Sequence, residues 1–241
     1  MELVKWQYRS PYSLKQREHE RLFVFGAHTV VMQQQPHREI SLQQNTGFLV
    51  WDGAYILAKF LYARLHLRGK RCVELGAGGA LVSIVARLAG AARVVATDMP
   101  EYLDFIRTNV GLNSVGTSTR RVNLRLKPKP EAEAEVEVEV RELVWGHPVS
   151  PDLLPVDVVF GSEILYLSSQ HTALLHTLSQ LMQTNHTVGY FIYKHRNLQE
   201  QNFATLAQEQ GFSVKELPQA MIDSEFHSES YALLKIMKVK M

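Results

Sequence analysis

Cysteine is the scarcest residue of this chain, with Cys72 as the single example among 241 residues. One thiol excludes an internal disulfide framework and a zinc site built from Cys-x-x-Cys pairs. Cys72 lies in an apolar run, where we interpret it as a small buried side chain. Histidines such as His147, His195 and His227 lack the spacing of metal ligands, so we expect no metal site.

Long apolar stretches and a strong charge of either sign are also lacking. No apolar run approaches the roughly 20 residues needed to cross a bilayer, and the first residues lack the apolar core of a secretory signal. The net charge of +2 and the isoelectric point near 8.6 give no broad basic field. We interpret the basic triplet at 194–196 as a solvated loop. We expect a monomer of the cytoplasm, or alternatively the nucleus, that contacts neither membranes nor nucleic acid.

A glycine cluster that joins an apolar run to a helical pattern is the most informative stretch. Residues 71–75 are followed by Gly76, Gly78 and Gly79, after which apolar residues recur at helical spacing. Glycine permits positive φ and leaves room for a ligand to approach the backbone, while the following helix directs unpaired N–H groups to the same place. The stretch therefore predicts a nucleotide-binding loop between a strand and a helix.

A second apolar run, residues 92–97, ends in Asp98. A carboxylate at a second strand end is placed to accept hydrogen bonds from both ribose hydroxyls of an adenosine. Together with the glycines, it fits a dinucleotide and S-adenosylmethionine about equally. Leu81 stands where a dinucleotide fingerprint has its third glycine, and the acid Glu74, just before Gly76, suits a cationic ligand better than a pyrophosphate. We therefore favour S-adenosylmethionine, which carries a sulfonium and an ammonium group and no phosphate.

Strand and helix patterns alternate along the chain, which predicts an α/β fold with a mostly parallel sheet covered on both faces. A helix at 54–65 precedes the first sheet strand, and the last two strands are expected to pair as an antiparallel edge hairpin. Residues 21–25, 29–32 and 39–43 are expected to form a small β layer outside the sheet. The expected strands are 71–75, 93–97, 121–127, 156–162, 187–193, 212–217 and 230–239, and the expected helices are 80–90, 101–113, 169–183 and 198–210.

This pattern predicts a β extension at residues 1–45 and one compact domain at residues 46–241. Its one compositional oddity is residues 127–140, in which prolines precede an alternation of glutamate with valine. The alternation predicts an exposed strand, whereas the prolines and alanines are typical of a loop. An acidic face here could attract a basic partner, but we interpret it as a solvated strand edge that its charges protect from aggregation.

Glu163 and Tyr166 directly follow the apolar run 156–162. Ligands of open parallel sheets bind outside the carboxyl ends of the strands, beside the point where the strand order reverses. We therefore expect both side chains over the reactive end of the cofactor, although a glutamate there can also simply begin a helix. Trp51 and Trp145 lie in loops flanking the sheet, where an indole can cover a ligand or join the core.

Five short motifs resemble the family 16 methyltransferases, a seven-stranded, Rossmann-like, S-adenosylmethionine-dependent group that includes protein-lysine methyltransferases such as the one acting on valosin-containing protein. The most specific motif is the acid-x-x-aromatic signature from Glu163 to Tyr166, and the resemblance implies that these two residues line the acceptor entrance. The motifs are residues 50–54, 73–78, 97–98, 143–146 and 163–166. The resemblance implies cofactor contacts from Trp51, Gly76, Ala77, Gly78, Asp98, Trp145 and Ser162, and we add Glu74 and Met99 to this set.

The function implied by the resemblance is methyl transfer from S-adenosylmethionine to a lysine side-chain nitrogen of a protein substrate. The alternatives are a methyltransferase of the same fold acting on another protein nitrogen or a small molecule, and a non-catalytic binding module that kept the fold. The chain departs from the family pattern at Ala80, where many members have glycine, and at Glu163, which replaces a commoner aspartate. The Glu-Val segment is a third departure.

Overall fold

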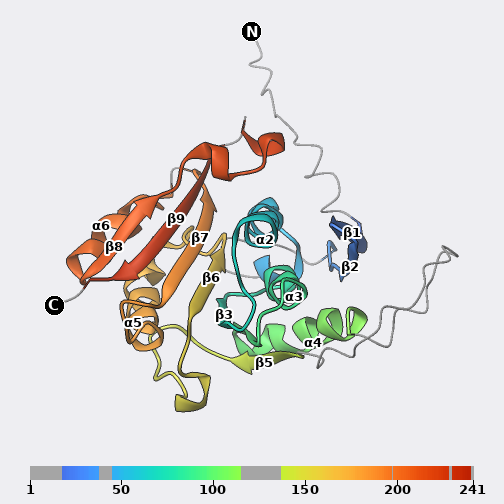
Figure 1. Ribbon diagram of the computed structural model, residues 1–241, viewed down its shortest axis with the longest axis horizontal. Helices are drawn as coiled ribbons and strands as arrows, with labels where there is room; N and C mark the ends of the chain where they lie inside the picture. Colours follow the sequence, from blue (N-terminus) through green and yellow to red (C-terminus); the bar gives the residue numbers. More distant parts are fainter. Residues whose placement is uncertain (1–17, 38–44, 115–136, 197, 228–229, 240–241) are drawn as a thin grey trace, which may run out of the picture.

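The computed structural model describes residues 18–37, 45–114, 137–196, 198–227 and 230–239 (Figure 1). Within them, one sheet has seven strands in the order β5-β4-β3-β6-β7-β9-β8, and two further strands, β1 and β2, pair separately. Neighbours from β5 to β7 run parallel, whereas β9 is antiparallel to both β7 and β8. The predicted α/β fold, with its mostly parallel sheet and antiparallel edge, is therefore confirmed.

The central sheet strands are short apolar runs rich in β-branched residues, as expected of strands buried on both faces. The predicted strand at 121–127 lies outside the described residues. The strand beside β4 is instead β5, at the end of the Glu-Val segment. The sheet strands are β3 (Arg71–Leu75), β4 (Arg93–Asp98), β5 (Val138–Glu142), β6 (Val158–Ser162), β7 (Val188–Lys194), β8 (Phe212–Glu216) and β9 (Tyr231–Lys238).

Helices cover both faces of the sheet, and each overlaps its predicted range. The first three pack with one face of the sheet in a single hydrophobic cluster, and the last two pack on the opposite face. Figure 1 shows the two groups on either side of the sheet. The helices are α2 (Asp52–Arg64), α3 (Leu81–Leu88), α4 (Leu103–Leu112), α5 (His171–Leu181) and α6 (Asn202–Glu209).

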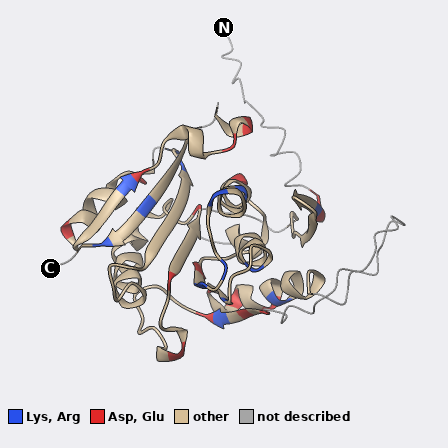
Figure 2. Cartoon of the chain, in the orientation of Figure 1, with Lys and Arg blue, Asp and Glu red and all other residues tan. Residues whose placement is uncertain are grey.

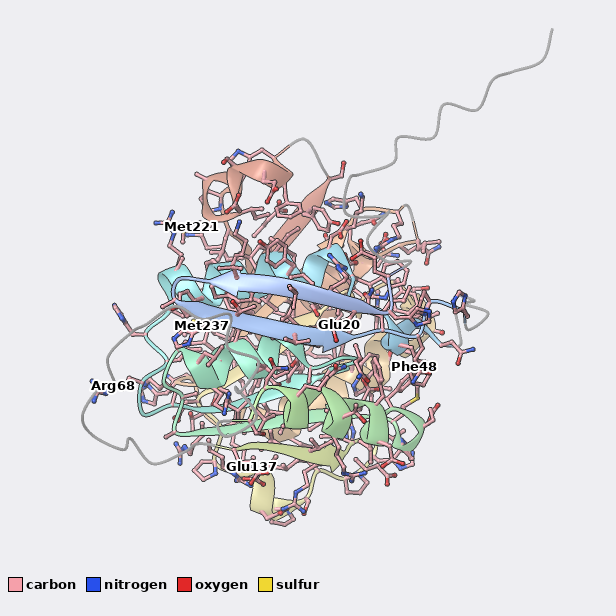
Figure 3. The ribbon with its side chains drawn as sticks, turned by 90° about the vertical axis from the view of Figure 1, so that its right-hand side faces the viewer. Glu20, Phe48, Arg68, Glu137, Met221 and Met237 are labelled. Carbon is pink, nitrogen blue, oxygen red and sulfur yellow. The ribbon has the colours of Figure 1, made fainter. Side chains whose placement is uncertain are left out.

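The predicted N-terminal hairpin is present as β1 (Glu20–Phe25) and β2 (His28–Gln33), and it lies across α2, α3 and α4 (Figure 3). Alternate side chains point inward and join the same hydrophobic cluster as α2 and α3. The backbone N–H of Gln33 donates to the amide oxygen of Asn109 on α4, and that of Val31 donates to the amide oxygen of Asn113, directly after α4. The extension thus shares a core with the rest of the chain, and the predicted third strand at 39–43 lies outside the described residues.

The strand order reverses at β3. The chain runs from β3 to β4 and then to β5 on one side, and returns to β6 on the other side. Connections leave the carboxyl ends of β3 and β6 in opposite directions, which opens a crevice above these ends. No helix in the described part of the chain is both long and apolar enough to cross a membrane.

Candidate active site

A cavity of about 550 Å³ lies at the carboxyl ends of β3, β4 and β6. Its wall is mostly apolar and is completed by the segment before α2 and by loops after β5, β6 and β7. All of the residues predicted for the site except Glu74 line it, so the structure brings together positions that are far apart in the sequence. These lining residues are Trp51, Gly76, Ala77, Gly78, Asp98, Met99, Trp145, Ser162, Glu163 and Tyr166.

The glycine loop between β3 and α3 forms the floor of the cavity. Gly76 and Gly78 have φ values of 61° and 53°, in the left-handed region that favours glycine. A Cβ atom on Gly76 would lie 2.8 Å from Cγ2 of Ile164, so any side chain there would displace the cavity wall. Ala80 also adopts left-handed backbone, with φ 64°, directly before α3. This conformation costs a residue with a Cβ atom about 1–2 kcal/mol relative to ordinary helical backbone.

Glu74 differs from the prediction. Its carboxylate Oε2 accepts hydrogen bonds from the backbone N–H of Ser83 at 2.8 Å and from the Ser83 hydroxyl at 2.6 Å. Successive side chains of a strand point to opposite faces, and Glu74 shares its face with α3 rather than opening to the cavity. Burial raises the pKa of Glu74 to about 8, although the two Ser83 hydrogen bonds oppose this shift. Glu74 thus ties β3 to α3 and does not line the cavity.

Asp98 ends β4 and connects it to the glycine loop. One carboxylate oxygen accepts from the backbone N–H of Gly78 at 2.7 Å, and the other from that of Met99 at 2.8 Å. Burial raises the pKa of Asp98 to about 6, while these two backbone hydrogen bonds lower it. A carboxylate has about four acceptor positions, so each oxygen can still accept a hydrogen bond from a ligand hydroxyl.

Thr46 joins two aromatic residues of the cavity wall, Trp51 and Tyr166, and no sequence motif pointed to it. The indole N–H of Trp51 donates to the backbone carbonyl of Thr46 at 2.8 Å. The Thr46 hydroxyl lies 3.1 Å from the hydroxyl of Tyr166. The segment before α2 and the loop after β6 are therefore linked at the cavity wall.

Glu163 is held by an unusual backbone conformation, by an ion pair and by close packing against Gly53. It follows β6 with a φ of 57°, an unusual value for a residue with a side chain. Its Oε2 atom lies 2.6 Å from Nη1 of Arg196, whereas its buried Oε1 atom has no hydrogen-bond partner among the described residues. A Cβ atom on Gly53 would lie 2.6 Å from both Cγ and Oε1 of Glu163. Gly53 therefore supplies the space that the carboxylate occupies.

Arg196 corrects the prediction of a solvated loop at 194–196. Its side chain is 30% exposed, but it lines the cavity and forms an ion pair with Glu163, so it is not the fully solvated side chain that we expected. The pairing joins residues 33 positions apart through the neighbouring strands β6 and β7. No local sequence pattern announces such a contact, because it depends on the order of strands in the sheet.

The charges of the cavity favour a cationic ligand. Among the described lining residues, Asp98 and Glu163 are the acids and Arg196 is the one basic side chain, already paired with Glu163. A diphosphate is usually bound by basic groups as well as by backbone N–H groups. The balance of one carboxylate in excess suits a sulfonium and disfavours a diphosphate.

A family model described as lysine methyltransferase matches residues 34–210. The chain belongs to the lysine methyltransferase family. It is 33% identical over 216 residues to the protein N-lysine methyltransferase METTL21A of Mus musculus, with 87% of each chain covered. It is 36% identical over 173 residues to METTL21A of Danio rerio, covering 70% of each chain.

Solved structures agree with this family at the level of the fold. The ribosomal protein L11 methylase from Lactobacillus delbrueckii superposes with a TM-score of 0.55 at 12% identity, covering 92% of this chain and 100% of that one. Magnesium protoporphyrin IX methyltransferase from Synechocystis, solved with bound S-adenosylmethionine, gives a TM-score of 0.52 at 12% identity and 78% coverage of both chains. The chain is an S-adenosylmethionine-dependent methyltransferase with the Rossmann-like fold of this class.

Proposed function

We propose that this lysine methyltransferase transfers a methyl group to a lysine side-chain nitrogen of a protein, with Glu163 binding the acceptor amine. The observation that carries the proposal is the buried Oε1 atom of Glu163, which lacks a hydrogen-bond partner among the described residues, on a residue that lines the same cavity as Asp98. A buried acceptor without a partner is costly, so such an atom marks a position for a ligand donor. The similarity to proteins named N-lysine methyltransferase supports lysine as the acceptor.

The cofactor is proposed to lie with its ribose at Asp98 and its methionine part over the glycine loop. Asp98 would accept the ribose hydroxyls, and the loop Gly76–Ala77–Gly78 would approach the cofactor with its backbone. The sulfonium of S-adenosylmethionine supplies an electrophilic methyl group and leaves as a neutral thioether. The remaining proposed contacts, which enclose the cofactor from the sides, are Trp51, Met99, Trp145 and Ser162.

The acceptor lysine must be neutral when it reacts, since its nitrogen lone pair forms the new bond to the methyl carbon. An unperturbed lysine has a pKa near 10.4, but desolvation in the apolar cavity and a nearby positive charge lower that value. Glu163 Oε1 would accept an N–H hydrogen bond and direct the lone pair toward the methyl group, while Tyr166 would shape the channel. Rate enhancement then comes chiefly from holding nitrogen and carbon in line.

The test is to incubate the protein and its Glu163→Ala variant with labelled S-adenosylmethionine and cell lysate, and to locate the methyl group by mass spectrometry. We expect a labelled protein, modified on lysine, only with the wild type. Methylation of arginine or of an α-amino group would instead support another protein nitrogen, as in the relatives named histone-arginine methyltransferase METTL23 and protein N-terminal and lysine N-methyltransferase EFM7. Labelling of small molecules alone, or no labelling at all, would contradict the proposal.

A protein rather than a nucleic acid is proposed as substrate because Lys and Arg are scattered over the described elements instead of gathering along one face (Figure 2). The monomeric state and the cytoplasmic or nuclear location stay predictions, as does the domain boundary at residue 46. Size-exclusion chromatography with light scattering tests the first, and cell fractionation tests the second.

A further inference from the structure

Arg196 forms an ion pair with Glu163, the residue proposed to bind the acceptor amine. The proposed function assigns no role to Arg196. It follows β7, and its side chain reaches the end of β6 to place Nη1 2.6 Å from Oε2 of Glu163. The backbone N–H of Lys194 also approaches Oε2, at 3.3 Å. Both donors therefore contact the same carboxylate oxygen, and the buried Oε1 is left without a hydrogen-bond partner among the described residues.

The loop that carries Arg196 is held by a second buried acid. Glu200 is 1% exposed, and its carboxylate accepts hydrogen bonds from the backbone N–H of Arg196 at 3.0 Å and of Leu198 at 2.9 Å. These two hydrogen bonds hold the backbone of the loop, so the Arg196 side chain approaches Glu163 from one defined direction. The contact is a built feature of the site and not an incidental surface pair.

The electrostatic surroundings keep the guanidinium charged. Burial lowers the pKa of Arg196, but the carboxylate of Glu163, assisted by Tyr231 and Glu200, outweighs burial and raises it. The pair of Arg196 and Glu163 therefore has no net charge. The other titratable groups around it are Lys194 at the end of β7, Tyr231 at the start of β9, Glu200 before α6, Asp52 beside Gly53, and Asp98 and Tyr166 in the cavity wall.

The charge of the pair matters because a lone carboxylate would bind the wrong form of the acceptor. An uncompensated buried carboxylate stabilises a lysine ammonium and raises the lysine pKa, which removes the nucleophilic lone pair. A carboxylate balanced by a guanidinium still accepts a hydrogen bond through its open oxygen but no longer favours the cation. The same balance reduces the preference of the cavity for a cationic over a neutral cofactor form.

We propose that Arg196 is a positioning residue that occupies Oε2 of Glu163 and balances its charge, so that Oε1 alone receives the acceptor, as a neutral amine. The proposal rests on the proposed function for the identity of the acceptor. Its electrostatic part concerns the cavity itself and can be tested without any acceptor.

The first experiment compares two cofactor forms that differ by one charge at sulfur. Calorimetry gives the affinities of the full-length protein for S-adenosylmethionine and for the neutral thioether S-adenosylhomocysteine, from pH 6 to pH 9. Both ligands share the ribose, the α-amino group and the α-carboxylate, so the titration of Asp98 affects them alike and cancels in the ratio. The ratio therefore reports the charge beside the sulfur.

In Arg196→Met, we expect the ratio to favour S-adenosylmethionine on the order of tenfold over the wild type, because the Glu163 carboxylate then lacks its counter-charge. In Arg196→Lys, we expect the ratio of the wild type. Arg196→Gln keeps a hydrogen-bond donor without the charge and should behave like Arg196→Met, which also serves if the methionine variant does not fold.

The matched control is Arg107→Met, which breaks an exposed ion pair with Asp104 on α4 and does not involve a residue that lines the cavity. It should leave the ratio unchanged. If Arg196→Met and Arg196→Gln weaken both ligands by the same factor at every pH, Arg196 has only a structural role and the proposal is wrong.

The second experiment uses the protein acceptor labelled in the lysate. In Arg196→Met, the acid limb of the pH profile of kcat should move to higher pH by about one unit, and KM should be lower than in the wild type. In Arg196→Lys, the acid limb should lie at the same pH as in the wild type. An unshifted profile contradicts the acceptor part of the proposal. If mass spectrometry finds the methyl group on another atom, the proposed function fails, while the affinity ratio still decides whether Arg196 balances Glu163.

Discussion

Asp98 and Glu163 are both buried carboxylates at the ends of parallel strands, but the chain holds them in different ways. Backbone N–H groups hold Asp98, one from the glycine loop and one from the adjacent residue Met99. A guanidinium 33 residues away holds Glu163, in a space left by Gly53. The proposed cofactor end is thus built from backbone geometry and the proposed acceptor end from side chains of separate elements. We expect the first to tolerate side-chain changes around it and the second to be sensitive to them.

The largest effect should come from Glu163→Ala, which removes the proposed acceptor contact. We expect methyl transfer to fall on the order of 1,000-fold, since both orientation and hydrogen bonding of the amine are lost. The affinity for S-adenosylhomocysteine, measured by calorimetry, should stay within about threefold because its proposed contacts lie at the other end. Retained activity would show that Glu163 is not the residue that binds the acceptor amine.

Gly53→Ala tests whether the acceptor end depends on packing from α2. The new Cβ would overlap Cγ and Oε1 of Glu163 and displace the carboxylate, so we expect transfer to fall about 100-fold. The matched control is Gly111→Ala on α4, where a Cβ would meet nothing within 4 Å. This control should keep full activity and raise the free energy of unfolding by about 1 kcal/mol, measured in urea. Equal activities of the two variants would contradict the proposed dependence on Gly53.

Asp98→Asn tests the cofactor end. We expect the affinity for S-adenosylhomocysteine to fall about thirtyfold at pH 8, because an amide is a weaker acceptor for the ribose hydroxyls than a carboxylate. The pKa of Asp98 near 6 predicts that the wild type loses affinity as the pH falls through 6, while the variant does not. Calorimetry at pH 5 and pH 8 checks both statements, and parallel pH curves for the two proteins would exclude the ribose role.

Glu74→Gln should have the smallest effect on cofactor affinity of these variants. It should show that Glu74 contributes to stability and not to cofactor binding. Because burial raises the folded-state pKa of Glu74 from 4.5 to about 8, its contribution to stability is full below pH 4.5 and is lost as the pH rises through 8. The variant should therefore gain at least about 1 kcal/mol over the wild type between pH 5 and pH 9 in urea unfolding. Cofactor affinity should change less than twofold. A large loss of affinity would restore Glu74 as a direct contact.

The glycine loop, the Asp98 strand end and the Glu163–Tyr166 signature were all predicted correctly as parts of one cavity. Each is a local pattern whose position at a strand end follows from the period of the strand and the direction of a parallel sheet. Glu74 was misjudged because the pattern shows that it lies on β3 but not which face it occupies. Its partner, Ser83, is on the helix that follows.

Local sequence patterns specify the fold and the proposed cofactor end, because the alternation of apolar runs and the glycine loop act over a few residues. The proposed acceptor end arises only from the packing of distant elements. Arg196, Thr46 and Gly53 reach Glu163 and Tyr166 only because β7 lies next to β6 and α2 packs over the same edge. Contacts of this kind depend on the order of strands and on shape complementarity between distant segments, neither of which leaves a local mark in the chain.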